Sequence, residues 1–113
     1  MIYSEMSDTE INARVAKTLD GVTRVNLPID GTTLFHAPRI QMKRNGKWEW
    51  FDPCNSWADA GPIIQENGIN LFALKVIDSA GLKEWEAMSI EGYCHHWGDL
   101  NPLRVVTIVF LKR

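Results

Sequence analysis

The sequence has few of the features by which a biochemical activity is recognised directly. It has two cysteines, Cys54 and Cys94, so at most one disulfide could form. It has no Cys-x-x-Cys spacing, no glycine-rich phosphate loop and no Gly-x-Ser-x-Gly elbow. These absences argue against a zinc ribbon, a P-loop nucleotide site and a serine-hydrolase site. The sequence therefore points to no particular reaction.

The chain also lacks a charge excess, a signal peptide and a long apolar run. Its 113 residues carry a net charge of −2, which argues against general attraction to nucleic acid or anionic membranes. Residues 1–5 have neither the basic start nor the apolar run of a secretion signal, and the longest apolar run cannot span a bilayer. We therefore expect a cytoplasmic protein with reduced cysteines, no membrane contact and no cofactor.

The length suits one domain over residues 1–113, and the pattern of segments predicts an α+β fold. We expect a small antiparallel sheet packed with about three helices. The five tryptophans are the one excess in the composition. Such a number is more typical of a core than of an aromatic binding surface.

Helices are expected near both ends of the chain. Ser7 and Glu10 form a capping box that opens the first helix, which Gly21 ends. At the other end, Asn101-Pro102 is an N-cap followed by proline at the first helical position. The apolar run 105–110 favours a strand by propensity, but the start signal decides for a helix.

The clearest local signal is Asn45-Gly46, which predicts a two-residue hairpin turn between residues 39–44 and 47–51. This register places Lys43 opposite Trp48, and Gln41 opposite Trp50, on one face. The other face carries Ile40, Met42, Glu49 and Phe51. Either face could be buried. Because large aromatic side chains are usually well covered, the pattern favours inward tryptophans.

The remaining segments are assigned by composition and alternation. Residues 22–27 read as a strand, and residues 32–37 as a second strand or part of a long loop. Residues 69–77 are apolar on both faces, which indicates a strand covered on both sides. Residues 82–90 read as a partly solvated strand, and residues 92–100 as a loop.

The segment 51–68 combines a turn with a short helix that ends at Asn67-Gly68. If Ser56 were the N-cap, Pro62 would fall in the helix interior and cost about 3 kcal/mol. We therefore prefer Asp59 as the N-cap, with residues 55–58 as a tight turn before it.

Three sets of residues could carry chemistry. A hairpin surface suited to stacking bases and binding phosphates comprises Arg39, Lys43, Arg44, Lys47, Trp48 and Trp50. The turn residues Asp52, Cys54, Asn55, Asp59 and Pro62 are interpreted as structural, since such side chains accept backbone N–H groups at turns and helix starts.

The third set contains the cysteines and histidines, namely Cys54, Cys94, His36, His95 and His96. Adjacent histidines rarely share one ion, and nothing marks a helix-activated thiol. We expect no metal and no catalytic Cys-His pair.

Three stretches together resemble a known family. They are Tyr3-Ser4-Glu5-Met6-Ser7-Asp8 with Glu10-Ile11-Asn12 and Arg14-Val15-Ala16; Phe51-Asp52-Pro53-Cys54-Asn55 with Ala58-Asp59-Ala60, Pro62-Ile63-Ile64 and Glu66-Asn67; and Asn101-Pro102-Leu103-Arg104 with Ile108-Val109-Phe110-Leu111. The chain is similar in these to the NinX-like proteins of lambdoid phages and prophages. Family members more usually have alanines at the positions of Val105 and Val106. The basic hairpin and residues 71–100 lie outside the resemblance.

The resemblance implies a phage accessory protein in the bacterial cytoplasm and implies no reaction. We expect a non-catalytic protein that binds a host or phage protein. The alternatives are a nucleic-acid-binding module that uses the hairpin and, below it, a small enzyme that uses the turn from Asp52 to Asp59. A continuous basic and aromatic face would favour nucleic acid, and an apolar patch with a polar rim would favour a protein partner.

Overall fold

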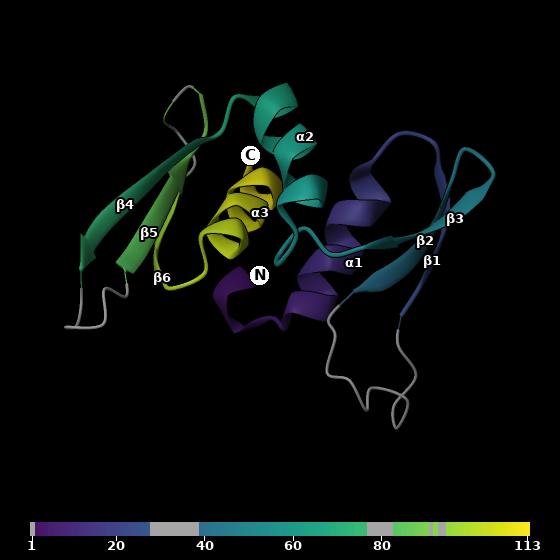
Figure 1. The fold of residues 1–113 in the computed structure, drawn as a ribbon, viewed down its shortest axis with the longest axis horizontal. Helices are drawn as coiled ribbons and strands as arrows, with labels where there is room; N and C mark the ends of the chain where they lie inside the picture. Colours follow the sequence, from purple (N-terminus) through teal and green to yellow (C-terminus); the bar gives the residue numbers. More distant parts are fainter. Residues whose placement is uncertain (1, 28–38, 77–82, 91, 93–94) are drawn as a thin grey trace. The chain divides into compact units, whose positions relative to one another are not determined.

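The protein has an α+β fold in which helices accompany antiparallel sheets (Figure 1). The structure is a computed structural model that describes residues 2–27, 39–76, 83–90, 92 and 95–113. The chain divides into two compact units, an N-terminal unit of residues 1–52 and a C-terminal unit of residues 53–113. The described strands lie in two sheets, one in each unit, where the sequence predicted one sheet. The organisation as a single domain stays a prediction.

The N-terminal unit packs one helix against a three-stranded sheet. Its elements are the 3-10 turn η1 (Tyr3–Glu5), the helix α1 (Asp8–Thr18) and the strands β1 (Val22–Asn26), β2 (Ile40–Arg44) and β3 (Lys47–Phe51), in the sheet order β1-β2-β3. Helix α1 begins as predicted, because the Ser7 hydroxyl accepts the Glu10 N–H at 3.2 Å. Its buried stripe of Ile11, Val15 and Ala16 belongs to the side that packs on β1 and β2.

The hairpin has the predicted turn and register. Asn45 and Gly46 both adopt positive φ angles, 51° and 82°, as a two-residue turn matched to the twist of its strands requires. Lys43 pairs with Trp48, and Gln41 with Trp50. Turn chemistry therefore sets the pairing of β2 with β3.

The prediction that the hairpin tryptophans face inward is wrong. Ile40, Met42 and Phe51 are buried, whereas Trp48 is 45% and Trp50 is 54% exposed. Ile40 and Met42 belong to the strand that packs against α1. Because side chains alternate along a strand, burying one face of the hairpin turns every side chain of the other face to solvent.

The C-terminal unit packs two helices with a second antiparallel sheet. Its elements are α2 (Trp57–Asn67), β4 (Asn70–Val76), β5 (Lys83–Met88), β6 (His95–Asp99) and α3 (Pro102–Lys112), with the sheet order β4-β5-β6. The predicted last helix is confirmed as α3. The Asn101 side chain accepts the N–H groups of Leu103 and Arg104 at 3.0 and 3.3 Å. Residues 105–110 are all buried, and α3 packs on α2, β5 and β6.

The predicted start of α2 at Asp59 is wrong, because Ser56 is the N-cap and accepts the Asp59 N–H at 3.3 Å. Pro62 therefore lies inside the helix. The residue before a proline is normally held out of the helical conformation partly by its own Cβ, and here that residue is Gly61, which has none. The predicted end of the helix is confirmed, since Gly68 adopts a left-handed conformation with a φ of 60°.

Two further predictions for the C-terminal unit are wrong. The strand at 69–77 was expected to be covered on both faces, but Phe72 and Leu74 of β4 are 45% and 44% exposed. Within the described residues β4 pairs with β5 alone, so it forms an edge of the sheet. Residues 95–99, expected in a loop, form β6. The strand predicted at 32–37 lies outside the described residues.

Candidate functional site

The solvent-facing side of the N-terminal sheet gathers aromatic and basic side chains from all three strands. Residues paired across antiparallel strands lie on the same face, so the pairings define two rows. One row is Arg24, Lys43 and Trp48, and the next is Asn26, Gln41 and Trp50. With Arg39, these seven residues form what we call the aromatic–basic face.

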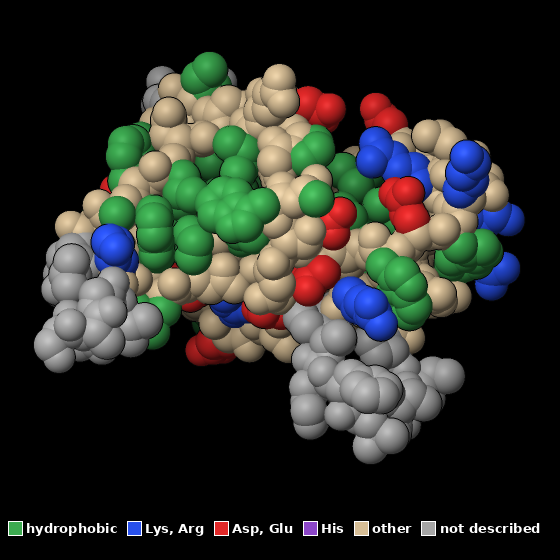
Figure 2. All heavy atoms as spheres, viewed as in Figure 1, with side chains coloured by type: hydrophobic (Ala, Val, Ile, Leu, Met, Phe, Trp, Pro, Cys, Tyr) green, Lys and Arg blue, Asp and Glu red, His purple; other side chains and the backbone are tan. Residues whose placement is uncertain are grey.

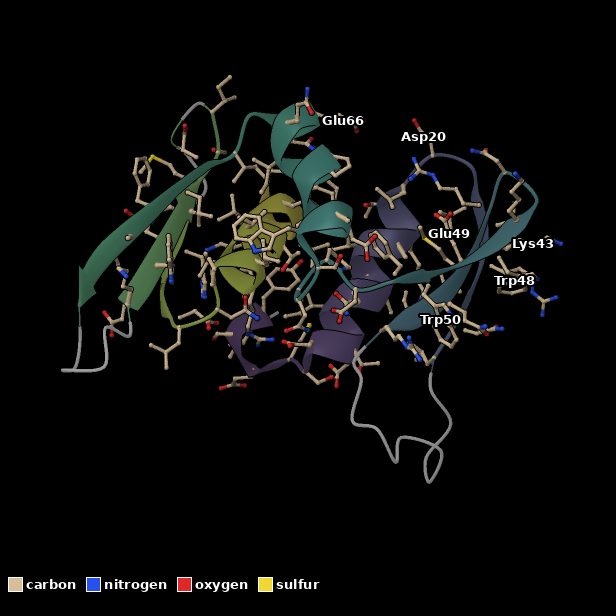
Figure 3. The ribbon with its side chains drawn as sticks, viewed as in Figure 1. Asp20, Lys43, Trp48, Glu49, Trp50 and Glu66 are labelled. Atoms are coloured by element: carbon tan, nitrogen blue, oxygen red, sulfur yellow. The ribbon has the colours of Figure 1, made fainter. Side chains whose placement is uncertain are left out.

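The two indoles lie side by side on this face, and one of them is covered by a cation. Figure 3 shows Trp48 and Trp50 on one side of β3 and Glu49 on the other. The Arg39 guanidinium lies over the Trp50 ring, 4.3 Å from its centroid, as in a cation–π contact. Trp50 nevertheless stays 54% exposed. The face therefore offers two accessible rings with a cation already placed against one.

The charge of the face is of one sign. Arg24, Arg39 and Lys43 lie on it, and no position of this face in the described strands holds an Asp or Glu. Within the described residues, none of these three cations takes part in a salt bridge. In Figure 2 hydrophobic side chains lie beside Lys and Arg side chains over β2 and β3. The face is thus locally cationic in a chain of net charge −2.

The structure separates the six hairpin residues singled out from the sequence. Arg39, Lys43, Trp48 and Trp50 share the aromatic–basic face, whereas Arg44 and Lys47 pair with each other on the opposite side of the sheet. Arg44 is engaged internally, since its Nε donates to the Asp20 carbonyl at 3.1 Å. The alternation of the two hairpin strands predicts this division.

Sequence reasoning missed Arg24, which completes the face from β1. Its placement depends on an irregularity in the pairing of β1 with β2, between Val22 and Arg24. Without that irregularity, Arg24 would follow strict alternation from Val22 and share its face. No short sequence signal marks such a bulge here, so Arg24 could be placed only with the register known.

The connection from α1 to β1 holds the tip of the hairpin in place. The Asn45 N–H donates to the Gly21 carbonyl at 2.9 Å. Gly21 has a φ of 81°, and a Cβ added to it would collide with the Asn45 side-chain amide. Glycine is therefore required at this position both for its conformation and for the close approach of the hairpin tip.

The turn that follows the hairpin uses its polar groups inside the fold. In the N-terminal unit, the buried Asn12 amide donates to the Asp52 carboxylate at 2.7 Å. In the C-terminal unit, the Asn101 amide donates to the Cys54 carbonyl at 2.8 Å and to the Asn55 side-chain oxygen at 3.3 Å. Asn101 thereby joins the turn to the start of α3. These bonds support the structural interpretation of the turn, which stays a prediction.

The sequence matches the family described as Bacteriophage P22, NinX over residues 2–113. The chain belongs to this NinX family. The match confirms the resemblance seen in the sequence and extends it to the hairpin and to residues 71–100, which that resemblance did not cover. No curated protein matches the chain. Both the aromatic–basic face and the turn therefore lie within the NinX-family region.

The cysteines and histidines of this NinX-family chain do not gather into a metal-binding group within the described residues. Cys54 is buried, and its Sγ lies 3.5 Å from the Thr107 hydroxyl. Cys94 and His36 are outside the described residues. His95 Nδ1 lies 3.8 Å from a Glu86 carboxylate oxygen.

The surroundings of His96 displace its pKa. Burial is the main cause that lowers the pKa of His96. The positive charges of Lys112 and Arg104 lower this pKa further, and the negative charge of Asp99 raises it. The neutral imidazole is therefore favoured in the folded protein.

Within the described residues, no helix has the length and apolar character needed to cross a membrane.

Proposed function

We propose that this NinX-family chain is a non-catalytic phage accessory protein that acts by binding a host or phage macromolecule in the bacterial cytoplasm. The aromatic–basic face is the binding surface. The observation that carries the proposal is the exposure of Trp48 and Trp50 on a hairpin whose smaller apolar side chains are buried.

Exposed indoles forgo a large stabilisation of the fold. Burial of apolar surface stabilises a protein by about 25 cal/mol per Å², and an indole is among the largest apolar surfaces a side chain offers. Tryptophan and arginine are also the residues that most often dominate the energy of an interface. Two adjacent rings, with Arg39 fixed against one of them, are suited to make contact with a partner.

The turn residues offer less support for catalysis. Asp52 and Asn55 have hydrogen-bond partners within their own units, and the Ser56 hydroxyl caps α2. A general acid or base must reach the proton it transfers. Side chains that are engaged in hydrogen bonds within the fold are poorly placed to transfer a proton to or from a substrate. An enzyme that uses this turn is therefore the weaker proposal.

The proposal is tested by capture from bacteria that carry the phage. Tagged wild type would be compared with Trp48→Ala/Trp50→Ala and with Trp57→Ala, and protein and nucleic acid would both be recovered. Trp57 is the matched control because it is 58% exposed and lies on α2 of the other unit.

We expect at least one macromolecule to be recovered with wild type and with Trp57→Ala and to be lost with the double variant. Thermal unfolding should show that the double variant remains folded. An identical set of captured molecules from all three proteins would contradict the proposal.

A further inference from the structure

The chemistry of the aromatic–basic face also indicates which class of macromolecule it binds. Resting on the binding role proposed above, we propose that the ligand is single-stranded nucleic acid, with bases stacked on Trp48 and Trp50 and phosphates bound by Arg24, Arg39 and Lys43. A protein partner, which the sequence favoured, is expected to meet an apolar patch with a polar rim. Here Arg24 and Lys43 lie in the row of Trp48, and Arg39 lies over the ring of Trp50, so the cations stand next to the rings rather than in a separate rim.

The spacing of the rings suits bases that are drawn apart. Trp48 and Trp50 are two residues apart on one strand, so their positions are separated by about 7 Å along β3. Bases in a stacked strand are separated by about 3.4 Å. A strand that places successive bases on the two rings must therefore be extended and unstacked, which a single strand permits and a duplex does not.

The cations lie where the backbone of such a strand would run. Lys43 lies on β2, the strand next to Trp48, and Arg24 lies one strand further away on β1, with neighbouring strands about 4.8 Å apart. Phosphates over β1 and β2 would thus leave their bases above β3. Arg39 can contribute in two ways. Its guanidinium stacks on the Trp50 ring, and the N–H groups at the edge of the guanidinium remain able to donate to phosphate oxygens.

The net charge of −2 does not oppose this ligand. Charges on the surface are screened over about 8 Å at physiological ionic strength, so a bound strand is affected mainly by the face it touches. That face has three cations and, in the described strands, no carboxylate. Rings beside cations that form no salt bridge within the described residues match the general design of surfaces that bind single strands without reading sequence.

The test is a titration of the full chain with mixed-sequence 12-nucleotide DNA and RNA, each single-stranded, and with the duplex of the same DNA sequence. Binding is followed by quenching of tryptophan fluorescence and, independently, by anisotropy of a fluorescein-labelled strand. Polyglutamate serves as a probe with charge but no bases. A tighter complex with RNA or with DNA identifies which of the two the face prefers.

We expect both single strands to bind at least tenfold more tightly than the duplex and than polyglutamate. Trp48→Ala/Trp50→Ala should weaken binding by tenfold or more, since each stacked base contributes strongly, while Trp57→Ala should bind as wild type. Arg24→Gln, which removes no ring, should reduce the slope of log K against log salt concentration by about 0.7.

Three results would overturn the assignment. They are single-strand binding unchanged in both the double variant and Arg24→Gln, duplex binding equal to that of the single strands, and polyglutamate binding equal to that of the oligonucleotides. If capture from cells recovers only a protein that depends on Trp48 and Trp50, and no oligonucleotide binds, the nucleic-acid assignment fails while the binding role stands.

Discussion

The aromatic–basic face and the turn of residues 52–59 both carry the residue types from which functional sites are made, but their side chains are used differently. In the turn, Asp52, Asn55 and Ser56 each take part in a hydrogen bond that shapes their own unit. On the face, Arg24 and Lys43 have no such bond from their side chains within the described residues, and the rings project into solvent. A candidate site is therefore better judged by the partners of its side chains than by its composition.

The largest expected difference is between the two faces of the hairpin. Met42→Ala should lower the free energy of unfolding by about 2–5 kcal/mol, because it opens a cavity at a side chain that is 1% exposed. Trp48→Ala/Trp50→Ala should lower it by less than about 1 kcal/mol, because neither ring is buried. Urea unfolding at equilibrium measures both. A double variant as unstable as Met42→Ala would show that the rings are core residues.

The next effect concerns the turn, through Asn101. Asn101→Ala removes the cap of α3 and the two bonds to the turn, and should cost about 2–3 kcal/mol. Asn101→Ser retains a capping oxygen but cannot reproduce the amide donors, so it should cost about 1 kcal/mol. Thermal unfolding of both variants measures the difference. A stability of Asn101→Ser equal to that of wild type would mean that the bonds to the turn contribute nothing, and equal losses in the two variants would mean that the capping oxygen contributes nothing.

A smaller effect distinguishes the two possible caps of α2. Ser56→Ala should cost about 1 kcal/mol, because the hydroxyl accepts the Asp59 N–H. Asp59→Ala should cost less, about 0.3–1 kcal/mol, since its carboxylate mainly adds negative charge to the first turn of the helix. The pair should be compared by chemical unfolding at neutral pH. A larger loss for Asp59→Ala would restore the cap expected from the sequence.

The smallest effect is a pH dependence from His96. Its pKa is lowered in the folded state, chiefly by burial, so the unfolded chain binds the proton more readily. Above the usual pKa of 6.5 both states are neutral and the group has no effect. As pH falls below 6.5 the free energy of unfolding should fall, and the loss should level off below the folded pKa. His96→Gln should weaken this pH dependence, which urea unfolding at a series of pH values measures. If the free energy of unfolding of His96→Gln changes with pH as steeply as that of wild type, the prediction is wrong.

Local signals in the sequence were sufficient wherever a few neighbouring residues decide the structure. Ser7, Asn45-Gly46 and Asn101-Pro102 fix two helix starts and one turn through their own side chains and backbone preferences. The register of the hairpin follows from the turn alone. The central-helix cap was predicted wrongly because the cost of Pro62 was set at its usual value, although Gly61 removes part of the steric reason for that cost.

What the sequence could not supply depends on contacts between distant segments. The buried face of the hairpin is decided by the packing of α1 against β1 and β2, and Arg24 reaches the candidate site only through an irregular pairing. Residues 95–99 form a strand because β5 provides a partner, although their own composition resembles a loop. In each case the deciding interaction is with a segment many residues away.

The contact between Gly21 and Asn45 has a consequence for how the surface chemistry of the protein can change. A one-residue slip of β3 against β2 would turn Trp48 and Trp50 toward the side of α1 and expose Phe51, because side chains alternate along the strand. The hairpin tip is anchored to Gly21 by a backbone hydrogen bond. An insertion at residues 45–46 would therefore change more than the length of a loop, since it would alter the turn that sets the register and displace the hairpin tip from Gly21, and with them the chemistry that this surface presents to solvent.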